Sequence, residues 1–226
     1  MPTHTSQAAE DYLKALHSLE AENQLAGFDR GVTTQAVAER LDVAAASATN
    51  MLKKLAAMGL VAHVPYRGAK LTNKGRRVAL EVVRHHRLLE TYLAEVLGVP
   101  WDRVHEEAEV LEHVLSEDLE DRIASFLGDP TRDPHGHPIP AKDGSMNLPS
   151  DRRLWEVAIG KQIVVERVSD DRPEALRYLA EAGIKPGARV EVTRRGPVEG
   201  PLFVRTHGSQ EEVALSRELS ESVWVD

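Results

Sequence analysis

Residues 33–61 read TTQAVAERLDVAAASATNMLKKLAAMGLV, and this stretch decides the fold. Its first part predicts a short helix that begins at a threonine cap and turns Val37, Ala38 and Leu41 inward. A tight turn follows, and a second helix then extends to Gly59, a residue type common just after a helix C-terminus. Two helices joined by so short a turn indicate a helix-turn-helix.

The flanking segments complete a winged helix-turn-helix. Residues 6–23, SQAAEDYLKALHSLEAEN, place apolar side chains at helical spacing and predict a first helix with Ser6 as its N-cap. Residues 61–72, VAHVPYRGAKLT, alternate around a central Arg-Gly and predict a β-hairpin. Three helices followed by a hairpin are the order of elements in a winged DNA-binding domain.

The rest of the chain changes character twice. Residues 74–127 have helical patterns, and residues 128–150 are rich in Pro, Gly and Asp and predict an irregular connection. From about residue 158, short alternating segments surround one predicted helix at 173–183. We therefore expect a mainly α chain with a β C-terminal domain: a winged helix-turn-helix over residues 1–73, a helical domain over 74–140, a linker over 141–157 and an SH3-like β-barrel over 158–226.

Composition excludes several classes of protein. The chain has no cysteine, so neither disulfides nor thiolate metal sites are expected. No apolar run is long enough to span a membrane and no secretory signal is visible, so we expect a cytoplasmic protein without a membrane partner. The net charge of −8 disfavours nucleic-acid binding, but residues 1–80 sum to +3 and the remainder to −11. This asymmetry indicates different partners for the two parts.

The second helix of the helix-turn-helix is the expected DNA-reading element, because its N-terminal residues face base edges in the major groove. Small side chains there permit close approach, and an asparagine can bind adenine through two hydrogen bonds. Basic side chains on this helix and on the hairpin are suited to phosphates. The candidate DNA-binding residues are Ala44, Ala46, Ser47, Thr49, Asn50, Lys53, Lys54, Arg67 and Lys70.

Residues 105–122, HEEAEVLEHVLSEDLEDR, predict one acidic helix. His105, Glu109, Glu112 and His113 follow at i, i+4, i+7 and i+8, which places them on one helical face. His86 and Glu90 have the same i, i+4 spacing on another predicted helix, and Asp11 lies on the first helix. Histidines and carboxylates that converge from several helices form metal sites in helical bundles, although a solvated acidic face has the same composition.

The sequence resembles the diphtheria toxin repressor / manganese transport regulator family over essentially its whole length. The resemblance includes AEDYLKALHSLE (9–20), YRGAKLTNKGRR (66–77) and DPHGHPIP (133–140), and its specific motifs are HRLLE (86–90) and E-x-x-E-H (109–113). It implies a metal-binding and dimerisation role for the helical domain and a homodimer on double-stranded DNA. It also implies two metal sites per chain: a primary site of Asp11, Glu109, Glu112 and His113, and an ancillary site of His86, Glu90 and His105.

The donor types favour Mn²⁺ as the metal cofactor, with Fe²⁺ as the alternative. Iron-type members of the family have Met and Cys where this chain has Asp11 and Glu109, and hard oxygen donors suit Mn²⁺. Lys14 replaces a glutamate of the short manganese-type members, which argues against their closely bridged metal pair. The SH3-like domain of long members lends ligands to the ancillary site, for which Asp171 and Glu174 are candidates, although both also suit a helix N-terminus. We attribute His135 and His137 to structure or chance.

The expected function is a transcriptional repressor of metal-uptake genes, not an enzyme, with metal as co-repressor. A metal held by Asp11 and by residues of the helical domain would tie the two domains together and set the spacing of the recognition helices in a dimer. Two other hypotheses are a hydrolase with a two-metal site and a metal-independent winged-helix sensor of a small organic ligand. Metal dependence of DNA binding and a metal-stimulated hydrolysis assay discriminate among the three.

Overall fold

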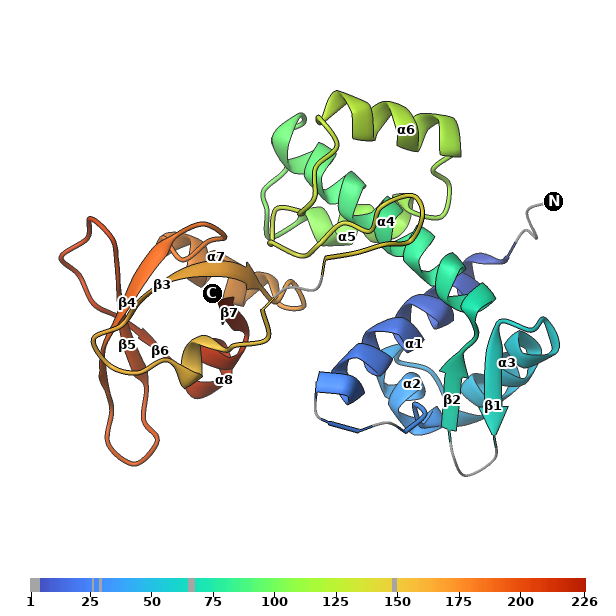
Figure 1. Cartoon of the computed structure of the whole chain (residues 1–226), viewed down its shortest axis with the longest axis horizontal. Coiled ribbons are helices and arrows are strands. Elements are labelled where there is room, and N and C mark those ends of the chain that lie inside the picture. Colours follow the sequence, from blue (N-terminus) through green and yellow to red (C-terminus); the bar gives the residue numbers. More distant parts are fainter. Residues whose placement is uncertain (1–4, 26, 29, 65–67, 148–149) are drawn as a thin grey trace. The chain divides into compact units, whose positions relative to one another are not determined.

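The computed structural model describes residues 5–25, 27–28, 30–64, 68–147 and 150–226 (Figure 1). The chain forms two compact units. The N-terminal unit contains residues up to 85 together with 112–114 and 140–145, and the C-terminal unit contains residues 86–111, 115–139 and 146–226. No helix in the described part of the chain has the length and hydropathy needed to cross a bilayer.

The N-terminal unit contains the predicted winged helix-turn-helix. Helices α1 (Gln7–Leu25), α2 (Thr34–Arg40) and α3 (Ala45–Ala57) precede strands β1 (Val61–Val64) and β2 (Gly68–Leu71), which pair antiparallel. Thr33 caps α2 by accepting a hydrogen bond from the Ala36 amide at 3.1 Å. Gly59 follows α3 with φ +71°, a backbone conformation that glycine adopts without strain. The fold prediction is confirmed here.

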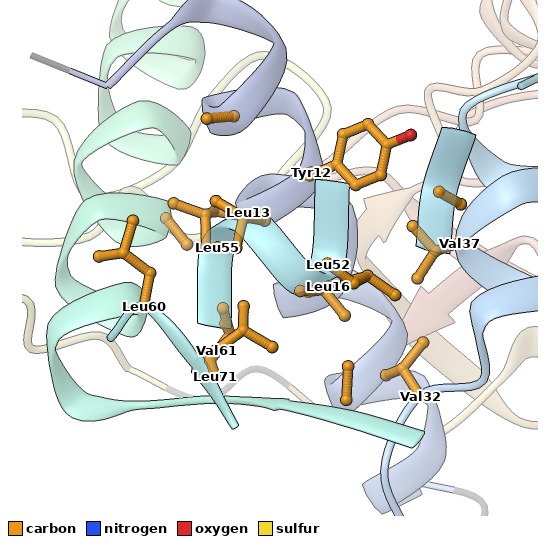
Figure 2. Close-up of a cluster of buried hydrophobic side chains, with 14 of the residues drawn as sticks. Tyr12, Leu13, Leu16, Val32, Val37, Leu52, Leu55, Leu60, Val61 and Leu71 are labelled. Carbon is orange, nitrogen blue, oxygen red and sulfur yellow. The ribbon is translucent and has the colours of Figure 1, made fainter. Parts of the chain in front are cut away.

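An apolar core holds these elements together. Leu13 and Leu16 of α1 meet Leu52 and Leu55 of α3, all fully buried, and Val37 of α2 closes one side (Figure 2). The hairpin is tied to this core by a buried acid: the Glu20 carboxylate accepts the Leu71 amide at 2.6 Å and pairs with Arg76 at 2.5 Å. Helix α1 is therefore held by the apolar core and by the hairpin, and these contacts fix the direction of its polar face.

The helical region that follows differs from prediction at one important place. Helix α4 (Asn73–Glu95) lies in the predicted helical region, but the predicted single acidic helix is two helices, α5 (Val104–Leu111) and α6 (Glu117–Phe126). The reason is local: the Ser116 hydroxyl accepts from the Leu119 amide at 3.3 Å, and acidic residues fill the first turn of α6, so a new helix begins there. Residues 112–116 therefore lie outside both helices, with a turn at 112–114, so Glu112 and His113 share no helical face with His105.

The C-terminal unit ends in a five-stranded antiparallel sheet of order β6-β5-β4-β3-β7. Its strands are β3 (Gln162–Val168), β4 (Arg189–Arg195), β5 (Leu202–Thr206), β6 (Val213–Leu215) and β7 (Val223–Val225). The expected helix is α7 (Pro173–Glu181), and the prediction missed the short α8 (Arg217–Glu221). It also missed a 3-10 turn, η1 (Leu154–Glu156), in the predicted linker, and the Leu154 side chain of this turn is buried in the barrel core.

Candidate metal centre

Three candidate ligands meet in the N-terminal unit. His113 Nε2 lies 2.8 Å from Asp11 Oδ1 and 3.6 Å from Glu112 Oε1. The other ring nitrogen, His113 Nδ1, lies 2.7 Å from Glu10 Oε2. Metal-bound histidines commonly donate their second N–H to a carboxylate, which fixes the ring and directs the other nitrogen at the metal. Glu10, which the sequence analysis did not single out, is therefore in the position of such a partner.

Lys14 supplies the positive charge in this group. Its ammonium donates to both oxygens of Glu112, at 2.7 and 3.0 Å, and the Glu112 side chain is fully buried. A buried carboxylate needs a cation, because desolvation alone disfavours its ionised form. Lys14 and a metal ion would therefore compete for the same two oxygens.

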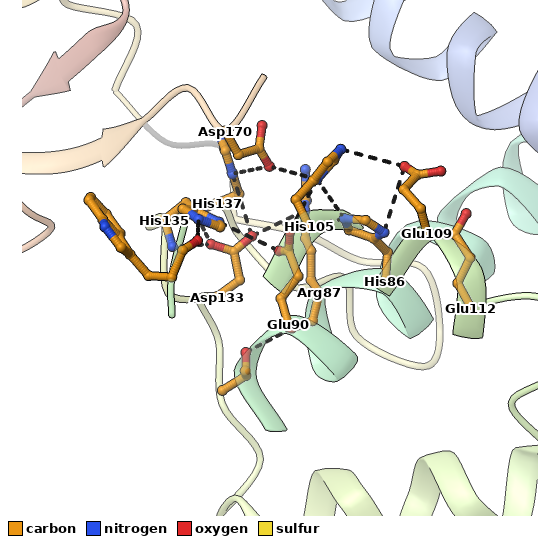
Figure 3. A network of polar contacts seen from close by, with 12 residues as sticks. His86, Arg87, Glu90, His105, Glu109, Glu112, Asp133, His135, His137 and Asp170 are labelled. Carbon is orange, nitrogen blue, oxygen red and sulfur yellow. Dashed lines mark hydrogen bonds and ion pairs between the residues drawn. The ribbon is translucent and has the colours of Figure 1, made fainter. Parts of the chain in front are cut away.

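A second group gathers in the C-terminal unit, on α4 and α5 (Figure 3). His86 Nε2 lies 3.0 Å from Glu90 Oε1, and His105 Nδ1 lies 3.3 Å from the same oxygen. Glu109 Oε1 stands 3.9 Å from His86 and 3.7 Å from His105, so both rings face it. These side chains are the predicted ancillary set plus Glu109, which had been assigned to the primary site.

Burial and neighbouring histidines perturb the ionisation of this group. Burial by itself would raise the pKa of Glu90, but the charge of His86 and the contacts with His105 and His135 outweigh it and hold the pKa well below its usual value. Burial would lower the pKa of His105, yet the hydrogen bond to Glu90 and the charge of Asp170 raise it. The Glu90 carboxylate is thus ionised and ready to bind a cation, while a proton competes with the cation for the His105 ring.

The SH3-like domain contributes an acid that the sequence analysis missed. Asp170, in the connection between β3 and α7, places Oδ2 3.6 Å from His105 Nδ1. Its neighbour Asp171 accepts a hydrogen bond from the Ser169 hydroxyl at 2.7 Å, and Glu174 lies in the first turn of α7. The structure thus brings Asp170 to the histidines, and it places Asp171 and Glu174 in none of the described ligand groups. Sequence spacing alone cannot tell which of the adjacent residues Asp170 and Asp171 reaches the histidines.

The chemistry of both groups fits a divalent first-row metal. Their donors are carboxylate oxygens and imidazole nitrogens, without sulfur, which suits Mn²⁺ and Fe²⁺. Glu90 Oε2 is buried and has no hydrogen-bond partner in the described part of the chain. A buried carboxylate oxygen without a donor indicates a position where a cation belongs.

The predicted DNA-reading helix exposes the expected side chains. Ala44 is the N-cap of α3, and Thr49 is half-buried with its hydroxyl bonded to the Ala45 carbonyl at 2.8 Å. Arg67 lies outside the described residues. The remaining candidates are exposed: Ala46, Ser47, Asn50, Lys53 and Lys54 on α3, and Lys70 on β2.

Three protein-family models match consecutive parts of this chain. Models of the iron-dependent repressor N-terminal DNA-binding domain, of its metal-binding and dimerisation domain, and of the FeoA domain match residues 4–69, 72–141 and 152–226. The iron-dependent repressor IdeR of Mycobacterium leprae is 34% identical over 232 residues, which cover 96% of both chains. This chain belongs to the iron-dependent repressor family. The predicted family membership is thereby confirmed.

Other members of the iron-dependent repressor family support the same assignment. The diphtheria toxin repressor of Corynebacterium efficiens is 30% identical and the match covers 96% of this chain and 94% of that one. A solved structure described as a manganese-dependent transcriptional repressor in complex with manganese is 41% identical. It superposes with a TM-score of 0.85 and covers 96% of this chain and 98% of that chain. This chain is thus similar both to relatives named for iron and to relatives named for manganese.

Proposed function

We propose that this protein is a metal-dependent DNA-binding transcriptional repressor whose co-repressor is Mn²⁺. One observation carries the proposal: Asp11, on the first helix of the winged domain, lies 2.8 Å from His113, which follows α5. A cation bound by Asp11, Glu112 and His113 links the DNA-reading domain to the segment that continues into the helical domain. The manganese description of the similar solved structure supports the same metal.

The bound metal would supply a concentrated positive charge that holds these carboxylates together. Asp11, Glu112 and His113 would be its protein ligands in the primary site, with Glu10 orienting the imidazole. Without the metal, Lys14 neutralises Glu112, while Asp11 has a 40% exposed side chain and contacts His113 Nε2 at 2.8 Å. Metal thus selects the arrangement of the winged domain that suits operator DNA.

The second group is proposed as the ancillary site. His86, Glu90 and His105 would bind a second metal ion, and Asp170 and Glu109 are the additional carboxylates within reach. This assignment moves Glu109 from the primary to the ancillary group and replaces Asp171 and Glu174 by Asp170. Two metal sites per chain remain the proposal.

A homodimer fits the apolar residues that the helical region leaves exposed. The sequence pattern suggested an interface of Leu88, Leu89, Tyr92, Leu93 and Leu97. Leu88, Leu89 and Leu93 are buried in this chain's own core and Tyr92 is half-buried, whereas Leu97 is exposed. Other exposed apolar side chains of the helical region include Val110, Val114, Leu119 and Phe126. Exposed apolar side chains of this size favour burial against a second copy.

Fluorescence anisotropy of labelled DNA tests the proposed function. DNA from upstream of the protein's own gene and of adjacent transporter genes is titrated with protein in EDTA, Mn²⁺, anaerobic Fe²⁺ or Mg²⁺. We expect binding with Mn²⁺ at lower metal concentration than with Fe²⁺, and none in EDTA. Asp11→Ala is expected to need at least tenfold more Mn²⁺, whereas Glu22→Ala, an exposed carboxylate on the same helix, is expected to behave as wild type.

The outcomes separate this proposal from the alternatives. Equal DNA binding in EDTA and in Mn²⁺ would favour a sensor of an organic ligand. Normal DNA binding by Asp11→Ala at limiting Mn²⁺ would contradict the link through Asp11. Metal-stimulated hydrolysis of model esters, lost in Glu90→Gln, would favour a hydrolase.

A further inference from the structure

The loop Asp133–His137 has a geometry that neither of the proposed sites uses. Asp133 Oδ1 accepts the amides of His135 and His137 at 2.8 and 3.0 Å, and the His137 carbonyl accepts the Asp133 amide at 3.0 Å. Gly136 has φ +88°, and a Cβ at this position would meet the Glu166 carbonyl oxygen at 2.1 Å. The glycine therefore lets the loop backbone press against β3, which holds the two flanking histidines in place.

His135 is oriented as a metal ligand would be. Its ring is buried and stacks on Trp101 with centroids 5.5 Å apart. Nε2 lies 2.8 Å from the Trp101 carbonyl oxygen, so this nitrogen carries the proton and donates. Nδ1 is buried, has no hydrogen-bond partner in the described part of the chain, and lies 3.7 Å from Glu90 Oε2. A backbone carbonyl that fixes the ring is the usual partner of a metal-bound imidazole.

Two carboxylates and a second imidazole lie beside it (Figure 3). Asp133 Oδ2 is buried and likewise lacks a hydrogen-bond partner among the described residues. His137 Nδ1 lies 3.4 Å from this oxygen and 3.6 Å from Asp170 Oδ2. One ligand atom from each of Asp133, His135 and His137 falls within a span of 4.8 Å.

These separations match those between ligands of one metal ion. Metal–oxygen and metal–nitrogen bonds of about 2.0–2.2 Å place tetrahedral donors about 3.4 Å apart. The two negative charges also favour a cation here, because Glu90 and Asp133 have fully buried side chains and the Arg87 guanidinium approaches Asp133 Oδ2 no closer than 3.7 Å.

We propose that Asp133, His135 and His137 form a third divalent-metal site, which Asp170 and Glu90 Oε2 complete. Glu90 then bridges two sites: Oε1 faces His86 and His105, and Oε2 faces His135. The loop site goes beyond the proposed primary and ancillary sites. It takes a first-row transition metal, because its donors combine imidazole nitrogen with carboxylate oxygen.

Counting bound Co²⁺ by equilibrium dialysis of the full-length protein tests this proposal, and the visible spectrum of each complex reports its coordination. His137→Asn removes one loop ligand at a half-buried position, Asp133→Asn retains the oxygen that caps the loop, and His86→Ala removes an ancillary ligand. His207→Asn, at an exposed histidine outside the described ligand groups, is the matched control.

We expect His137→Asn and Asp133→Asn each to lose one equivalent of Co²⁺ relative to wild type. The double variant His86→Ala/His137→Asn should lose two, and His207→Asn none. If the loop variants retain the wild-type stoichiometry and spectrum, or if the double variant loses no more than His86→Ala alone, the loop is not a separate site. These experiments compare the Co²⁺ stoichiometry of variants with that of wild type and use no DNA. Their outcome is therefore independent of the DNA-binding test of the proposed function.

Discussion

Replacing Lys14 by methionine separates two effects of one ion pair. The Lys14 ammonium lies 2.7 and 3.0 Å from the oxygens of Glu112, whose side chain is fully buried. Methionine retains most of the length of the lysine side chain but removes its charge. Metal-free Glu112 then loses its nearest cation, so the metal-free protein should become less stable.

The magnitude follows from the burial of the two partners. Removing one partner of a fully buried pair costs about 3–5 kcal/mol, but Lys14 is 19% exposed, so we expect about 2 kcal/mol. The same change removes the competitor for the Glu112 oxygens. If all of that free energy is recovered when Mn²⁺ binds, the affinity for the metal rises about thirtyfold.

Urea unfolding in EDTA and calorimetric titration with Mn²⁺ measure the two effects on Lys14→Met. Lys161→Met, at an exposed lysine, controls for the loss of one positive charge. Unchanged stability in EDTA together with unchanged Mn²⁺ affinity would refute the competition between Lys14 and metal. Lower stability without tighter Mn²⁺ binding would show that Glu112 is not a ligand.

Three further predictions concern the C-terminal unit. Burial would lower the pKa of His135, but the buried carboxylate that faces it raises the pKa to about 9. In EDTA, protonated His135 therefore adds about 3 kcal/mol to the free energy of unfolding below pH 6.5, and this contribution is lost as the pH rises through 9. The free energy of unfolding of His135→Gln, measured with urea, should depend less on pH over this range. Gly136→Ala should lower the urea midpoint far more than Gly187→Ala, because both glycines have positive φ but only the first would meet backbone at 2.1 Å. Glu109→Ala should weaken one Mn²⁺-binding step roughly tenfold or more in calorimetric titration, with Glu107→Ala, an exposed acid on the same helix, unchanged.

The fold was largely predictable because its signals are local. The threonine cap, the glycine after α3 and the apolar spacing of α1 each determine one boundary or one buried face. The prediction of one acidic helix was wrong because helical periodicity continues through Ser116, while the capping hydroxyl that begins α6 is a single-residue signal.

The ligand groups were only partly accessible from sequence. The prediction placed Glu109 and Glu112 in one site because it assumed a continuous helix. In the structure, helix α5 ends at Leu111, and the two residues belong to different units. Asp170 reaches His105 through tertiary packing of the β3–α7 connection, for which local sequence offers no signal. The loop histidines were set aside because the partners of His135, Trp101 and Glu90, lie far away along the chain.

The donor atoms of these groups also bear on oxidation. Every side chain in them ends in a carboxylate oxygen or an imidazole nitrogen, and the chain has no cysteine. A thiolate ligand is converted by peroxide to sulfenic acid and then to irreversible products, which removes it from the metal. This chain has no thiolate to lose, so peroxide cannot remove a ligand of the proposed metal sites by oxidising a cysteine. Under oxidative stress, a response to metal supply would therefore persist as long as the bound ion resists oxidation.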